Sequence, residues 1–218
     1  MMKVVLIGGS GATGRALIQL MLKSKEVTEI VVLLRRVSFD EHIKLKQVIV
    51  DFENLTDFER EIQGDIAISC LGTTLKDAGS KDAQWKIDHD LNLQFAALAK
   101  KNGFPTFLLL SALLADPASK IFYNRMKGTL EQDVKALNFN RLIIFQPGGL
   151  IRPNTDRFGE KTAITALRIL NTIGLFKSYK PLSVAQVASA ILQAINHYTI
   201  GIHTVNVKDI QKLATETS

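Results

Sequence analysis

The segment VVLIGGSGATGRALIQLML, residues 4–22, decides how the chain begins to fold. Its first four residues are apolar and three of them are β-branched, which is typical of a buried strand. Glycines follow at positions 8, 11 and 14, and from Thr13 onward apolar residues recur at the spacing of one helix face. A glycine triplet that joins a strand to a helix is typical of a dinucleotide-binding turn.

Each glycine of this turn has a physical role in binding a pyrophosphate. The first glycine makes the tight turn, the second lets the phosphates approach the backbone, and the third lets the helix pack on the sheet. The helix N-terminus adds free N–H groups and a partial positive charge. The residues predicted to hold the pyrophosphate are Gly8, Ser10, Gly11, Ala12, Thr13 and Gly14. The alternative is an ordinary glycine-rich turn.

Further along the chain, short apolar runs alternate with amphipathic segments. Strands are predicted at residues 30–34, 48–50, 65–69, 107–110, 142–145 and 202–207, and helices at 81–101, 119–137, 162–173 and 183–195. Strands that are apolar throughout, separated by helices, indicate a doubly wound parallel α/β sheet with helices on both faces, the Rossmann fold. We expect one domain over residues 1–218, in which residues from about 150 to 218 add a small C-terminal substrate lobe.

Composition excludes several classes of protein. The net charge is +6, but no run of five basic residues supports nucleic acid as the main partner. The single cysteine, Cys70, excludes a disulfide framework, and the four histidines lack the spacing of metal ligands, so no metal is expected. Glycines interrupt the apolar N-terminal segment, and residues 181–207 are too polar to span a bilayer. These observations predict a cytoplasmic protein without a membrane partner.

The end of the second predicted strand indicates which dinucleotide binds. NAD-binding sites usually place Asp or Glu there for the ribose hydroxyls. This chain has Arg35 and Arg36, which would pair with a 2′-phosphate. The sequence therefore favours NADP over NAD; the alternative is that both arginines lie in solvent.

Three residues form the predicted catalytic group. Tyr123 and Lys127 are four positions apart on a predicted helix and share a face. A lysine ammonium beside a tyrosine favours the phenolate, which can exchange a proton with a carbonyl or alcohol while hydride moves. Ser111, at the end of the fifth strand, is the expected third hydroxyl and precedes Tyr123 by only 12 residues. The alternatives are a surface Tyr–Lys pair and a serine that only caps the strand.

Three segments carry a resemblance to a known family. They are Cys70-Leu71-Gly72-Thr73-Thr74, Tyr123-Asn124-Arg125-Met126-Lys127-Gly128 and Gln146-Pro147-Gly148. Over roughly residues 3–153 the chain resembles the atypical short-chain dehydrogenase/reductases, in particular the Tat-interacting, metastasis-suppressor type of oxidoreductase and its bacterial relatives. The resemblance implies an NAD(P)-binding Rossmann fold in which the Tyr–Lys pair is catalytic and Lys127 also holds the nicotinamide ribose. It adds cofactor contacts at Asp51, Phe52, Leu71, Gly72, Thr73 and Pro147.

The chain also departs from this family's pattern at three positions. Asp88 stands where many relatives carry Asn, Gln146 where the family often has Arg, and Ala112 where it often has a second Ser. The Asp88 departure argues against a standard proton relay, and the departures at Gln146 and Ala112 leave the substrate side open.

The sequence as a whole predicts an NADP-dependent oxidoreductase that reduces a small carbonyl compound. One alternative is a dinucleotide-binding regulatory or assembly protein without turnover. Another is epimerase or dehydratase chemistry on a sugar nucleotide, which would need a larger substrate lobe. A small-molecule substrate is the expected partner, and a homodimer is compatible with the chain. The sequence gives neither the reaction direction nor the oligomeric state.

Overall fold

Seven parallel strands form the central sheet of the computed structural model, which describes residues 1–151 and 181–215. The strand order is β3-β2-β1-β4-β5-β6-β9, so the direction of winding reverses between β1 and β4. The strands are β1 (Met2–Ile7), β2 (Val27–Leu34), β3 (Leu45–Ile49), β4 (Ile66–Ser69), β5 (Thr106–Leu110), β6 (Arg141–Phe145) and β9 (Gly201–Val205). The predicted doubly wound Rossmann fold is confirmed.

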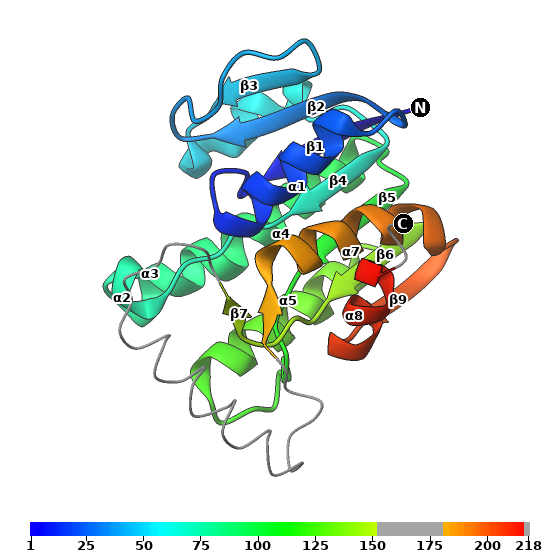
Figure 1. The fold of residues 1–218 in the computed structure, drawn as a ribbon. Helices are drawn as coiled ribbons and strands as arrows, with labels where there is room; N and C mark the ends of the chain where they lie inside the picture. The colour runs from blue at the N-terminus through cyan, green and yellow to red at the C-terminus, as the bar shows by residue number, and fades with distance from the viewer. Residues whose placement is uncertain (152–180, 216–218) are drawn as a thin grey trace.

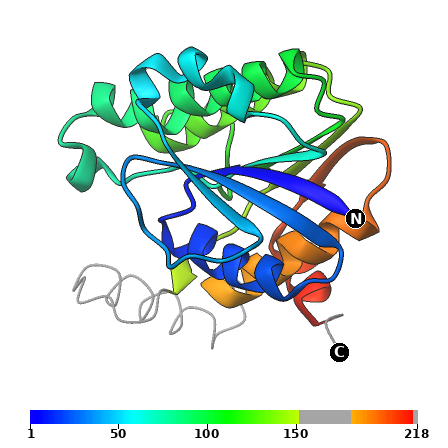
Figure 2. The same cartoon turned by 90° about the horizontal axis from the view of Figure 1, so that it is seen from above.

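Helices cover both faces of this sheet, as Figure 2 shows from above. One layer holds α1 (Ala12–Lys23), α7 (Val184–His197) and α8 (Val207–Thr215), and the other holds α4 (Leu91–Lys101), α5 (Phe122–Ala136) and the 3₁₀ segment η1 (Phe52–Glu61). The helix predicted over residues 81–101 is a continuous run of α3 (Lys81–Trp85), a π turn η2 (Lys86–Asp90) and α4. A further short helix, α2 (Leu75–Ala78), precedes it.

The apolar strands explain why both layers form. Side chains alternate across a strand, so Val4 and Leu6 of β1 join the core under α1 and α7, whereas Val5 and Ile7 join the core under α4 and α5. All four side chains are fully buried. A strand that is buried on both faces needs apolar residues at every position, which is the pattern that predicted the fold.

Two elements of the C-terminal segment belong to the main sheet and to one of its helix layers. β9 is the seventh strand beside β6, and α7 packs against α1 (Figure 1). The reason is the apolar face of α7, which needs the sheet and α1 to cover it. The small strands β7 (Leu150–Ile151) and β8 (Leu182–Ser183) pair with each other. The helix predicted at 162–173 lies outside the described residues, and the domain division there remains a prediction.

Candidate functional site

The glycine turn lies where the sheet reverses its winding, between the carboxyl ends of β1 and β4. Gly8 has a φ of +75°, and a Cβ there would lie 2.3 Å from the carbonyl carbon of Cys70. Only glycine fits this close approach in the left-handed region. Gly11 is the N-cap of α1 and makes no side-chain hydrogen bond, so the first N–H groups of the helix are open to a ligand.

A cavity of about 590 Å³ begins at this turn and extends across the carboxyl ends of the strands. Its walls come from the start of α1, the loop after β4, the end of β5, the first turns of α5 and the segment after β6. The predicted site residues that it brings together are Gly11, Ala12, Thr13, Leu71, Gly72, Thr73, Ser111, Tyr123, Lys127 and Pro147. The cavity therefore joins the proposed pyrophosphate turn to the proposed catalytic group.

A buried ion pair holds Lys127 at this cavity. The Lys127 Nζ lies 3.0 Å from the Asp88 Oδ1, and both side chains are almost completely buried. The other carboxylate oxygen of Asp88 accepts the backbone N–H of Thr73 at 2.7 Å. Asp88 thus connects the loop after β4 to α5. The sequence analysis identified Asp88 only as a departure from Asn and did not predict its pairing with Lys127.

Tyr123 lies one helical turn before Lys127, with the Lys127 Nζ 6.0 Å from the centre of its ring. Its side chain is half-exposed at the cavity, in contrast to the buried lysine. The Asp88 carboxylate is the counter-charge of the Lys127 ammonium. Lys127 and Asp88 together can place one positive and one negative charge beside a bound ribose.

The hydrogen-bond partner of Ser111 was not predicted from the sequence. The Ser111 hydroxyl donates a hydrogen bond to the Glu131 Oε1 at 2.5 Å, and both side chains are buried. Gln146 Nε2 donates to the two carboxylate oxygens of Glu131 at 3.0 and 3.1 Å. Glu131 lies eight residues after Tyr123, so the helical period was the signal that could have placed it on the same face.

The loop between Ser111 and Tyr123 is short because it folds directly onto α5. Asp116 N donates to the Asn124 carbonyl at 3.0 Å. A Cβ on Gly128 would lie 2.3 Å from the backbone of Asp116, so this helix position must be glycine for the loop to pack. Leu114, at the cavity wall, has a φ of 62°, which is strained for a bulky residue.

A second hollow, of about 520 Å³, is lined by Ser10, Arg15, Arg35, Arg36, Val37 and Ser38. Arg15, which the sequence analysis did not single out, donates to the carbonyls of Ser10 at 3.1 Å and Ser38 at 3.0 Å. Its guanidinium lies 4.9 Å from the centre of the Phe39 ring. Among the described residues, three arginines and no acidic side chain line this hollow, so it suits an anion.

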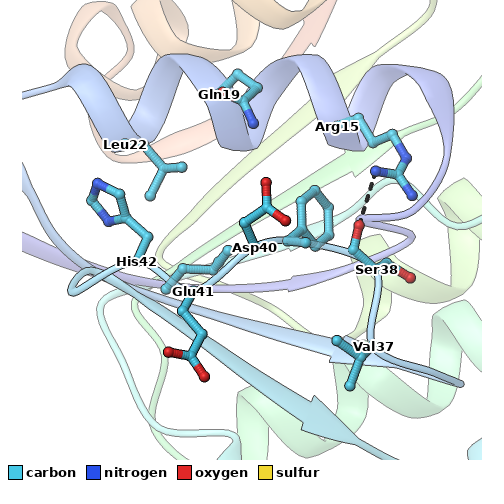
Figure 3. Close-up of a pocket in the computed structure, with 10 residues that line it drawn as sticks. Arg15, Gln19, Leu22, Val37, Ser38, Asp40, Glu41 and His42 are labelled. Carbon is cyan, nitrogen blue, oxygen red and sulfur yellow. Dashed lines mark hydrogen bonds between the residues drawn. The ribbon is translucent and has the colours of Figure 1, made fainter.

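A neighbouring groove of about 560 Å³ lies between α1 and the loop after β2 (Figure 3). Arg15 and Ser38 line both hollows, and their hydrogen bond is the dashed line in Figure 3. The groove also carries Asp40, Glu41 and His42. Because acidic side chains line it, the groove suits a phosphate less well than the arginine hollow does.

Asp51 and Phe52 line none of these three hollows. The Asp51 carboxylate caps η1 by accepting the Glu53 N–H at 2.9 Å. This backbone hydrogen bond, with one from the Asn54 side chain, holds the pKa of Asp51 below its usual value. Phe52 packs partly against the core under α4. Their contact with a cofactor therefore stays a prediction.

Cys70 also lines the main cavity and is partly buried there. Burial raises the pKa of its thiol to about 12, which favours the protonated form at neutral pH. A protonated cysteine packs as a small apolar residue.

Residues 8–198 match the NAD(P)H-binding family, and the chain belongs to that family. It is 38% identical over 152 residues to Protein HTATIP2 of Rattus norvegicus, covering 68% of this chain and 62% of that protein, which is less than two thirds of its length. It is 32% identical over 199 residues to Protein FMP52, mitochondrial, of Meyerozyma guilliermondii, covering 89% of this chain and 86% of the relative. The family resemblance drawn from the motifs is confirmed.

Solved structures show the same fold at low identity. The oxidoreductase ylbE from Lactococcus lactis has a TM-score of 0.70 and 18% identity, with 99% of this chain and 96% of that chain covered. The Bordetella bronchiseptica enzyme WbmH in complex with NAD⁺ has a TM-score of 0.71 and 16% identity, with 94% and 76% covered. These structures show the same fold, and the family match identifies it as an NAD(P)H-binding fold.

The expected cytoplasmic localisation is wrong on these comparisons. FMP52 relatives from several fungi, at 29–36% identity, are named as mitochondrial proteins. The reason for the error is that a single cysteine excludes a disulfide framework but does not distinguish one reducing compartment from another. Within residues 1–151 and 181–215, no helix has both the length and the apolar character to cross a membrane.

Proposed function

We propose that this protein is an NADP-dependent oxidoreductase that reduces a small carbonyl compound to an alcohol. The observation that carries the proposal is one cavity lined by the glycine turn, by Tyr123 and by the buried Lys127. A surface Tyr–Lys pair would not explain why the lysine is held by Asp88 under the loop after β4.

The residues present fit a dinucleotide. The open N–H groups at the start of α1 suit the pyrophosphate. Gly72 keeps space beside Lys127, because a Cβ there would lie 3.1 Å from the Asp88 carboxylate and 3.9 Å from the Lys127 Nζ. That space and that ammonium suit a ribose hydroxyl. The hollow with three arginines suits the 2′-phosphate and supports NADP over NAD.

The protein's own groups would then move the proton. When bound, the cofactor supplies the hydride. Tyr123 Oη donates the proton to the carbonyl oxygen, and Lys127 holds the ribose and steadies the charge on the tyrosine. Leu110, Leu113 and Leu150 supply apolar wall beside these groups and exclude water.

Cofactor binding is tested by thermal unfolding with NADPH and NADH for the unmodified protein and for Gly11→Val. A Cβ at Gly11 meets only the Gly8 carbonyl oxygen, at 3.3 Å, so the variant should fold while its side chain fills the phosphate path. We expect NADPH to raise the melting temperature of the unmodified protein only. A screen of aldehydes and ketones follows. No shift with either cofactor would refute the proposal, and NADPH binding without turnover on any compound would favour a binding protein.

A further inference from the structure

The buried Ser111–Glu131–Gln146 cluster lies beside the cavity but has no part in the proton transfer described above. Ser111 lines the cavity, whereas Glu131 and Gln146 lie behind it. Three donors approach the Glu131 carboxylate: the Ser111 hydroxyl, the Gln146 amide and, at 3.8 Å, the Lys135 ammonium. A carboxylate has acceptor oxygens only, so each of these groups approaches it as a donor.

This arrangement uses the only hydrogen of the Ser111 hydroxyl. A serine hydroxyl carries one hydrogen and two lone pairs. Its hydrogen is directed to Glu131, and its backbone N–H donates to the Phe145 carbonyl at 2.8 Å. The cavity therefore meets lone pairs of Ser111 rather than a hydrogen. The next residue, Ala112, provides no second hydroxyl.

We propose that Glu131 is a positioning residue that makes Ser111 a hydrogen-bond acceptor, so that the site recognises the alcohol form of its substrate at Ser111. The inference rests on the proposed oxidoreductase function and names which of the two substrate forms this wall of the cavity holds. An alcohol O–H can donate to Ser111. A carbonyl oxygen would face a lone pair of Ser111, so Ser111 does not stabilise it.

The preference of the site for the alcohol over the carbonyl must be measured as a difference in binding affinity, because the direction of the reaction does not report it. At saturating cofactor, the ratio of kcat/KM values for the carbonyl and the alcohol is fixed by the equilibrium constant and the two cofactor affinities, so contacts to the substrate do not set it. Binding can be measured without turnover in dead-end complexes, with cyclohexanol as probe on the NADPH form and cyclohexanone on the NADP⁺ form. Neither mixture can react.

Glu131→Gln is the decisive variant because it keeps the shape of the side chain and replaces a group that only accepts with an amide that can also donate. The glutamine amide can donate to Ser111, which frees the serine hydrogen to point into the cavity. We expect the affinity for cyclohexanone to rise about tenfold, the worth of one hydrogen bond of ~1.4 kcal/mol, while cyclohexanol changes by less than about threefold. A merely structural role of Glu131 would weaken both probes.

Ser111→Ala and the double variant isolate the path through the serine. Ser111→Ala should weaken cyclohexanol about tenfold and leave cyclohexanone unchanged. In the Ser111→Ala background, Glu131→Gln should have no further effect on cyclohexanone. A persistent gain there would show that Glu131 acts by its charge alone and would overturn the proposal.

A neutron diffraction map of the unmodified protein tests the hydrogen directly and does not depend on any variant folding. The proposal requires the hydrogen on Ser111 Oγ, directed to Glu131; a hydrogen on the Glu131 carboxyl would overturn it. If NADPH binds but no compound of the aldehyde and ketone screen is reduced, the proposed oxidoreductase function fails, and the neutron map still decides the position of the hydrogen.

Discussion

The buried pair of Lys127 and Asp88 gives the largest change in stability that the site predicts. Their charged atoms are 3.0 Å apart, and the side chains are 3% and 1% exposed. Asp88→Asn keeps an oxygen for the Thr73 N–H but leaves the ammonium buried without a counter-charge. Breaking a buried pair by changing one partner costs about 3–5 kcal/mol, so we expect a loss of that size from Asp88→Asn and from Lys127→Met.

The double variant separates the pair from its surroundings. With Asn at 88 and Met at 127 no unpaired charge remains, so most of the loss should be recovered, with a coupling of at least ~3 kcal/mol. Urea unfolding at constant m-value measures each free energy of unfolding. The exposed pair of Lys101 and Glu59, at 2.7 Å, is the matched control and should couple by less than ~1 kcal/mol. Single losses below ~1 kcal/mol, or simple additivity, would refute the buried pair.

Three further predictions concern the loop, the arginine hollow and the thiol. Gly128→Ala should destabilise the protein by several kcal/mol, because the new Cβ would overlap the backbone of Asp116. The usual effect of replacing Gly by Ala within a helix is a gain in stability. Chemical unfolding measures the change, and a neutral result would contradict the tight packing. NADPH should bind at least about tenfold more tightly than NADH, and Arg35→Ala with Arg36→Ala should remove the difference in titrations; equal affinities in the unmodified protein would place both arginines in solvent. At pH 8, Cys70 in the folded protein should react with a disulfide reagent roughly 1,000-fold more slowly than Cys70 in the unfolded chain, because folding raises its pKa from 9.0 to about 12. Similar rates in the two states would show an accessible thiolate.

The sequence predicted the fold because its signals are local. Each buried strand is a continuous apolar run, and the glycine turn is one segment between the first strand and the first helix. The last strand was also predicted, at 202–207, close to the observed β9. Its place beside β6 was not predicted, because that pairing joins positions about 60 residues apart.

The candidate site was predicted only where residues act within one element. The four-residue spacing of Tyr123 and Lys127 predicted that they share one helix face, and both line the cavity. The partner of Lys127 is Asp88, 39 positions earlier, and the partner of Ser111 is Glu131, 20 positions later. Which buried donor meets which acceptor depends on how β5 and α5 pack, and no single segment of sequence contains that information.

The most direct test of the central claim is the rate of NADPH-dependent carbonyl reduction by the unmodified protein and by Tyr123→Phe. The variant removes one oxygen and keeps the ring, and Tyr198→Phe, whose tyrosine lies outside the cavity, is the matched control. NADPH affinity should be unchanged in both variants. At saturating NADPH, turnover should fall by roughly 10²–10⁴-fold in Tyr123→Phe alone, the scale of general acid–base catalysis. Turnover that is unchanged in Tyr123→Phe would contradict the account.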